Sequence, residues 1–164
     1  MEVTEAKPSE GTAIYDRETY EPRDSVGHLT GKLRGEMLAA LDKELAADER
    51  LAGLEVSAAQ LIIIAAVAST PDRKSASDLC KGISYDAGAM TRMIDRLESK
   101  GLIRRERCPN DRRLVYLELT DEGRAAYPRM REISRRVGNR FLQGFTRAEA
   151  KQLEGFLRRM LENA

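Results

Sequence analysis

Residues 86–123, DAGAMTRMIDRLESKGLIRRERCPNDRRLVYLELTDEG, contain a helical pattern followed by a strand pattern. Apolar residues recur at helical spacing in the first half, at Met90, Met93, Ile94 and Leu97. Lys100 and Gly101 then supply a helix end. The strand-forming runs IRRERC and RLVYLELT follow, and PNDR between them has the residues of a turn. The stretch therefore predicts a helix that leads directly into a β-hairpin.

The preceding segment SASDLCKGIS (75–84) predicts a short helix, which makes two helices joined by a brief turn. The second helix has a small, polar and cationic face opposite its apolar one, formed by Gly88, Thr91, Arg92, Asp95 and Arg96. A helix that enters the major groove must be slim at its N-terminal end, and it needs Thr or Arg side chains to bond base edges. The pattern indicates a recognition helix, with Ser77, Gly88, Thr91, Arg92 and Arg96 as candidate DNA contacts.

The hairpin has an Arg-rich turn, and residues 88–113 as a whole hold eight Lys or Arg against four Asp or Glu. A hairpin directly after a recognition helix lies beside the groove that the helix occupies, so Arg112 or Arg113 can enter the adjacent minor groove. Asp111 is interpreted as a brace that orients these guanidinium groups. The predicted fold is mainly α with a small β-hairpin wing, a winged helix-turn-helix with helices on both sides.

Composition limits the other possibilities. The 164 residues are 34% charged and 41% hydrophobic, which favours one folded domain. The longest apolar run, 61–68, is too short to span a bilayer, and the first residues lack a signal-peptide layout. Two cysteines 28 positions apart indicate neither a disulfide framework nor a metal site. With one histidine and no catalytic constellation, we expect a cytoplasmic protein that is no enzyme and needs no cofactor.

Long amphipathic helices are expected on both sides of the winged segment. One apolar stripe runs from Val26 to Leu45, a second from Met130 to Phe141, and a third from Leu153 to Leu161. Capping boxes at Ser57–Gln60 and Thr146–Glu149 predict two helix starts. Because these stripes exceed what one small domain can cover, we expect a homodimer. The expected organisation is a polar arm (1–24), an N-terminal dimerisation helix (25–56), the winged domain (57–120) and C-terminal dimerisation helices (121–164).

Residues 77–123 resemble the core of the MarR family of bacterial transcriptional regulators. The resemblance lies in TRMIDRLESKGLI, in the DRR of the wing and in LTDEG at the entry into the next helix. It implies an obligate homodimer that binds an inverted-repeat operator and acts as a transcriptional repressor. Some relatives sense oxidants through a cysteine in the first helix. This chain has none there, so we interpret Cys80 and Cys108 as packing residues, with thiol sensing left as an alternative.

The resemblance also implies an effector, since many relatives release DNA on binding small aromatic carboxylates, phenols or their thioesters between the dimer helices and the winged domain. Arg34 and His28 are the candidates to hold a carboxylate. The apolar candidates are Leu33, Met37, Leu61 and Ile64, and Tyr15 or Tyr20 could act as lids. Arg34 as a paired surface residue and His28 as a structural residue remain open, as does a ligand-independent architectural DNA-binding protein.

Overall fold

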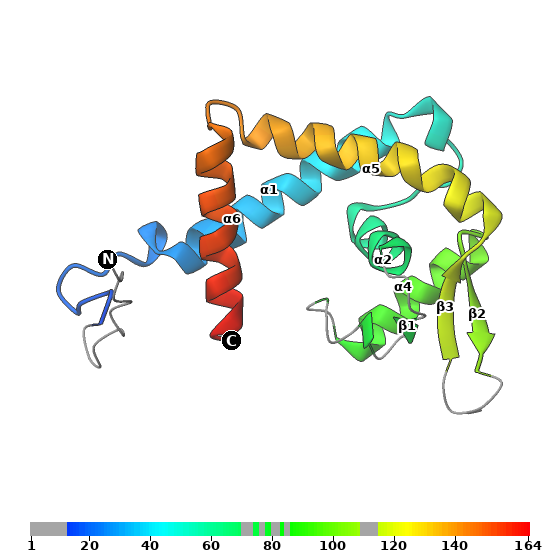
Figure 1. Cartoon of the computed structure of the whole chain (residues 1–164), viewed down its shortest axis with the longest axis horizontal. Helices are drawn as coiled ribbons and strands as arrows, with labels where there is room; N and C mark the ends of the chain where they lie inside the picture. The colour runs from blue at the N-terminus through cyan, green and yellow to red at the C-terminus, as the bar shows by residue number, and fades with distance from the viewer. Residues whose placement is uncertain (1–12, 70–73, 76–77, 80–82, 84–85, 109–114) are drawn as a thin grey trace, which may run out of the picture. The chain divides into compact units, whose positions relative to one another are not determined.

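The computed structural model describes residues 13–69, 74–75, 78–79, 83, 86–108 and 115–164. The chain forms two compact units, residues 1–35 and 36–164, and each is described by itself. Figure 1 labels the α-helices and the strands. Together with two 3-10 helices, η1 and η2, the elements in chain order are η1 (Pro22–Asp24), α1 (Val26–Ala46), η2 (Glu49–Leu51), α2 (Ala58–Ala68), β1 (Lys74–Ser75), α4 (Ala87–Ser99), β2 (Ile103–Arg107), β3 (Val115–Leu119), α5 (Asp121–Phe141) and α6 (Arg147–Glu162). The mainly helical architecture with a β-hairpin is the predicted one.

Side-chain caps set the predicted helix starts. Ser57 accepts a hydrogen bond from the Gln60 amide at 3.2 Å, and the Gln60 side chain accepts one from the Ser57 amide at 3.1 Å. Thr146 and Glu149 form the same reciprocal pair at the start of α6. Each box satisfies two amides that the first helical turn leaves without a partner. Both predicted helix starts are therefore confirmed.

The three strands form an antiparallel sheet in the order β1-β3-β2. The predicted hairpin is confirmed, with Ile103 opposite Leu119 and Arg107 opposite Val115. Strand β1 was not predicted, and it corrects the expectation that Ser75 begins a helix. Ser75 is instead paired with Tyr116, and its hydroxyl donates to the Asp78 carboxylate at 2.7 Å. The rest of that predicted helix lies largely outside the described residues.

The core of unit 36–164 lies between α2, α4, α5 and the sheet. Its fully buried large side chains are Ile63, Ile64, Leu79, Met90, Ile94, Leu97, Leu102, Ile103, Met130 and Ile133. Helix α2 packs against both α5 and β3, which explains why its sequence is apolar nearly all round. The predicted apolar face of α4 is confirmed, because Met90, Ile94 and Leu97 are buried. The opposite face of α4 is consequently left to solvent.

A tight turn joins α4 to β2. Gly101 has φ +68°, its amide donates to the Glu98 carbonyl at 2.9 Å, and the Leu102 amide donates to the Leu97 carbonyl at 3.0 Å. This is a Schellman helix end, for which glycine is favoured because it has no Cβ. Helix α5 then starts against the same turn, since the Thr120 amide donates to the Leu102 carbonyl at 3.1 Å. The hairpin thus leaves and returns at the end of α4.

Two segments leave apolar side chains exposed. On α6 they are Leu153, Phe156, Met160 and Leu161, and near the start of α1 they are Val26, Leu29 and Leu33. These residues belong to the stripes for which we expected a second subunit. Among the helices described, none combines the length and the hydropathy that crossing a membrane requires.

Candidate nucleic-acid interface

The exposed face of α4 carries four of the predicted DNA contacts, Gly88, Thr91, Arg92 and Arg96. Asp86 caps the helix by accepting from the Ala89 amide at 2.8 Å. A Cβ built on Gly88 would lie 3.4 Å from the Arg92 Nη1, so the Arg92 guanidinium extends back towards the first turn. A small residue and a cation therefore share the N-terminal end of α4, the end that a recognition helix turns to base edges.

Two features leave hydrogen-bonding groups on the exposed face of α4 available to a ligand. The Thr91 hydroxyl donates to the Ala87 carbonyl at 2.8 Å, so its oxygen lone pairs point outwards as acceptors. Arg92 and Arg96 form no ion pair with any other described residue. Their guanidinium groups, which hydrogen-bond guanine and phosphate alike, remain available to DNA.

Asp95 is exposed on the same face, as expected, and it also pairs with the wing. The Arg105 Nη2 of β2 donates to Asp95 Oδ1 at 2.5 Å, and its Nη1 donates to the Glu98 carboxylate. The hydrogen bond that Arg105 donates to Asp95 is the main reason that the pKa of Arg105 is raised. This pairing was not predicted from the sequence. A signal was present, because Asp95 and Glu98 lie three residues apart on one side of the helix and an Arg-containing strand follows directly.

The wing strands also contain a cross-strand pair. Arg104 lies opposite Glu118 and donates to its carboxylate at 2.9 Å. This hydrogen bond raises the pKa of Arg104. Arg107 is exposed and has no ion pair within the described part of the chain. Ser77, Asp111, Arg112 and Arg113 lie outside the described residues, and they stay predictions.

The predicted effector residues are distributed along the arm and α1. His28 and Arg34 are exposed and Met37 is half-buried. The Tyr15 hydroxyl accepts from the Val26 amide at 2.8 Å, and the Tyr20 ring packs edge-on against the Tyr15 ring at 5.0 Å. Tyr15 therefore contributes to the start of α1. The apolar candidates Leu61 and Ile64 are both buried in the core.

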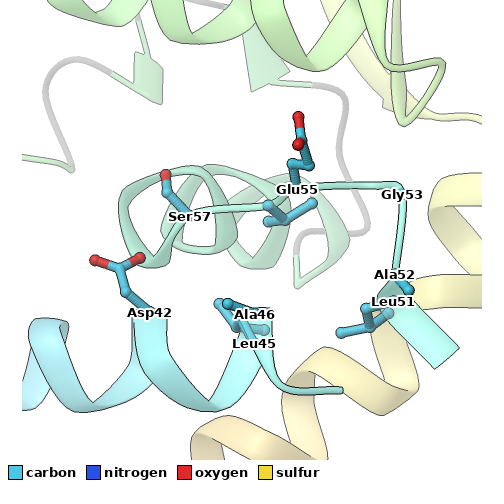
Figure 2. A pocket seen from close by; sticks show the side chains of 9 residues that line it. Asp42, Leu45, Ala46, Leu51, Ala52, Gly53, Glu55 and Ser57 are labelled. Carbon is cyan, nitrogen blue, oxygen red and sulfur yellow. The ribbon is translucent and has the colours of Figure 1, made fainter. Parts of the chain in front are cut away.

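Unit 36–164 has an open cavity of about 450 Å³ between the end of α1 and the segment leading into α2. Figure 2 shows its lining residues, Asp42, Leu45, Ala46, Leu51, Ala52, Gly53, Glu55, Val56 and Ser57, which include none of the predicted effector contacts. Asp42 accepts from the Ala58 amide at 2.6 Å, and the Glu55 carbonyl accepts from Lys100 Nζ at 2.5 Å. Within the described ranges, no cluster of three or more His, Cys, Asp or Glu side chains could hold a metal ion.

Known proteins share this segment and this fold. Residues 56–115 match the sequence model of the MarR family. This segment of the chain is therefore similar to the MarR family, a family of transcription regulators. Over 92 residues the chain is also 36% identical to YdgJ of Bacillus subtilis, an uncharacterized HTH-type transcriptional regulator. The alignment covers 56% of this chain and 56% of YdgJ, so the match spans little more than half of that relative.

Two solved structures extend the similarity to most of the chain. A mutant E. coli MarR in complex with operator DNA has a TM-score of 0.70 and 29% identity, covering 82% of this chain and 92% of that one. BpsR of Bordetella bronchiseptica has a TM-score of 0.73 and 25% identity, covering 86% of this chain and 96% of that one. The BpsR structure concerns regulation of its DNA binding by 6-hydroxynicotinic acid. The winged helix-turn-helix fold predicted for this chain is confirmed.

Proposed function

We propose that this protein is a transcriptional repressor that binds an inverted-repeat operator as a homodimer, with α4 in the major groove. The observation that carries the proposal is the division of α4. Its inner face is buried, while Thr91, Arg92 and Arg96 are exposed beside a hairpin fixed to the same helix. The operator complex of the E. coli relative supports this use of the fold.

The residues on α4 have different expected roles. Gly88 keeps the first turn slim, so that Thr91 and Arg92 approach base edges, where a well-made contact discriminates by about 1–3 kcal/mol. Arg96 lies one turn further along and is assigned to a phosphate. In the wing, Arg112 or Arg113 would reach the neighbouring minor groove, with Asp111 orienting them, and Ser77 would contact the backbone from the preceding segment.

A second copy of the chain is proposed to cover the exposed apolar residues of α6 and of the start of α1. An isologous dimer of this kind places two recognition helices about one turn of DNA apart, which matches two inverted half-sites. Repression is the simplest output, because a dimer bound over a promoter blocks polymerase sterically. An in vitro transcription assay that shows stimulation and no repression would contradict it.

An effector of the aromatic-acid class is proposed to release the DNA. The regulation of BpsR by 6-hydroxynicotinic acid supports this class, and Arg34 and His28 offer donors for a carboxylate. Calorimetric titration with salicylate, hydroxybenzoates and 6-hydroxynicotinate, with and without operator, tests it. A ligand that lowers operator affinity by about 100-fold supplies about 2.7 kcal/mol, and Arg34→Ala should abolish that effect. If none of these acids changes operator affinity, the effector class is wrong and DNA binding is unaffected.

The DNA-binding proposal is tested by selecting an operator from random duplexes and measuring its affinity by fluorescence anisotropy. Thr91→Ala and Arg92→Ala should relax base preference, and Arg96→Ala should weaken all sequences alike. Arg131→Ala on the exposed surface of α5 is the control, and it should bind like wild type. If all three α4 variants bind like the control, α4 is not the recognition helix.

A further inference from the structure

Arg105 is in the most cationic segment of the chain, yet its charge is directed into the protein. Its guanidinium bonds Asp95 at 2.5 Å and also bonds Glu98, and both acids are on α4. Glu98 in addition accepts from the Arg105 backbone amide at 3.3 Å. Because β2 is an edge strand, that amide points away from β3, and the carboxylate of α4 is its partner.

The three side chains form an ionic cluster with two negative charges and one positive charge. The cluster is only partly shielded, with 32% of the Arg105 side chain exposed, 57% of Asp95 and 40% of Glu98. Asp95 lies next to Arg96, whose side chain points to solvent. Without Arg105, the recognition helix would present two uncompensated carboxylates close to a polyanion, which is electrostatically unfavourable.

We propose that Arg105 is a positioning residue for DNA binding: it holds the wing strand in a fixed orientation against α4 and offsets part of the negative charge of Asp95 and Glu98, and it binds no phosphate itself. This inference rests on the proposed function of α4. A recognition helix and a wing that reach adjacent grooves must keep their relative orientation, because base contacts fail when the geometry shifts by about 1 Å. A guanidinium fork suits this task, since it bonds two carboxylates in fixed directions.

Arg107 provides a matched comparison. It lies two residues further along β2, on the same face of the strand, and it enters no ion pair with the described residues. A side chain that neutralises a phosphate lowers the salt dependence of binding when it is removed, by about 0.9 in the slope of log affinity against log salt. A side chain that acts through α4 lowers affinity and leaves that slope unchanged.

The test measures operator affinity over a salt series for Arg105→Ala and Arg107→Ala. We expect Arg105→Ala to lose roughly tenfold in affinity with an unchanged slope, and Arg107→Ala to lower the slope by about one contact. Arg105→Lys keeps the positive charge but lacks the forked guanidinium group, and its operator affinity should still fall several-fold. Thermal unfolding checks each variant, and if Arg105→Ala does not fold, Arg105→Lys carries the test. A lower slope for Arg105→Ala, or full affinity for Arg105→Lys, would overturn the proposal.

A double-mutant cycle with Asp95→Asn separates positioning from simple charge. We expect Asp95→Asn to weaken the wild type, because the brace loses a partner, and to strengthen Arg105→Ala, because an unpaired acid is removed. If Arg105 were a phosphate ligand, Asp95→Asn would strengthen both backgrounds equally. A wild type without preference for any operator would refute the proposed function. A wild type that prefers its operator, with Arg105 behaving like Arg107, would refute the positioning role alone.

Discussion

Gly123 marks the closest approach between α5 and the turn that enters β2. A Cβ at this position would lie 2.1 Å from the Leu102 carbonyl oxygen, a backbone atom that cannot turn aside. Gly123→Ala should therefore destabilise the protein by about 1–3 kcal/mol, the usual cost of overpacking. Gly138→Ala on the same helix is the matched control, because its Cβ would meet nothing within 4 Å. Urea unfolding should show the control unchanged or stabilised by up to about 1 kcal/mol. Equal effects at both positions would contradict this account.

Asp48 is buried and forms an ion pair with the partly exposed Arg129, which donates to Asp48 Oδ2 from Nη2 at 2.5 Å and from Nε at 2.8 Å. The hydrogen bond from Arg129 lowers the pKa of Asp48 below 3.8. A lowered pKa contributes stability above the unfolded value and loses it as the pH falls through the folded value. The free energy of unfolding of Asp48→Asn should therefore fall furthest below wild type at about pH 7, and the difference should shrink below about pH 4.

The control for this pH dependence is Asp121→Asn. Asp121 pairs with Arg124 at a fully exposed position, where solvent screens the interaction. Its effect on unfolding should be small at every pH. A difference between wild type and Asp48→Asn that stays constant from neutral to acid pH would show that the carboxylate charge is not what stabilises this junction.

At the residue level, the sequence predicted the orientation of α4 and missed its partners. Met90, Ile94 and Leu97 are buried as expected, because a helical period assigns one side of a helix to the core. The periodicity of apolar residues does not indicate which acidic side chain on one element pairs with which basic side chain on another. Asp95 was correctly placed on the exposed face, but its partner Arg105 is identified only by the folded chain.

Among the elements, those with long patterns or strong caps were predictable. Helices α1, α2, α4, α5 and α6 and the β2–β3 hairpin follow from apolar spacing, capping boxes and the Lys100–Gly101 helix end. Strand β1 has two residues, too few for an alternating pattern, and it exists because it pairs with β3. Ser75 was assigned to a helix because serine is a common capping residue, and a sequence does not show whether such a residue precedes the helix or begins it.

The cap of α4 should affect DNA binding more than overall stability. Asp86→Ala removes the acceptor for the Ala89 amide, which costs the first turn about 1 kcal/mol and frays the end that is expected to meet the bases. Operator affinity should fall by several-fold. Asp86→Ser keeps a capping oxygen and should bind nearly like wild type. Titration of the operator with both variants checks this, and equal affinities would show that the first turn is not held by its cap.

The complete assembly depends on the surfaces that one chain leaves uncovered. Phe156 and Met160 expose nearly half of their side chains on α6. Phe156→Glu should place a charge in the proposed dimer interface, give monomers in analytical ultracentrifugation and lower operator affinity by about 100-fold or more through loss of the second half-site. Arg158→Ala, two positions along the same helix, is the control and should remain dimeric. A dimeric Phe156→Glu would exclude α6 from the interface.

The central claim is that two copies of α4 read two half-sites in a fixed phase. Its most direct test is an anisotropy titration of three duplexes. The first is the selected inverted repeat, the second has the same half-sites moved apart by about five base pairs (half a helical turn), and the third is random DNA. The account predicts one dimer per inverted repeat, a preference over random DNA of roughly 10³-fold or more, and loss of most of that preference in the respaced duplex. Equal affinity for all three duplexes would contradict it.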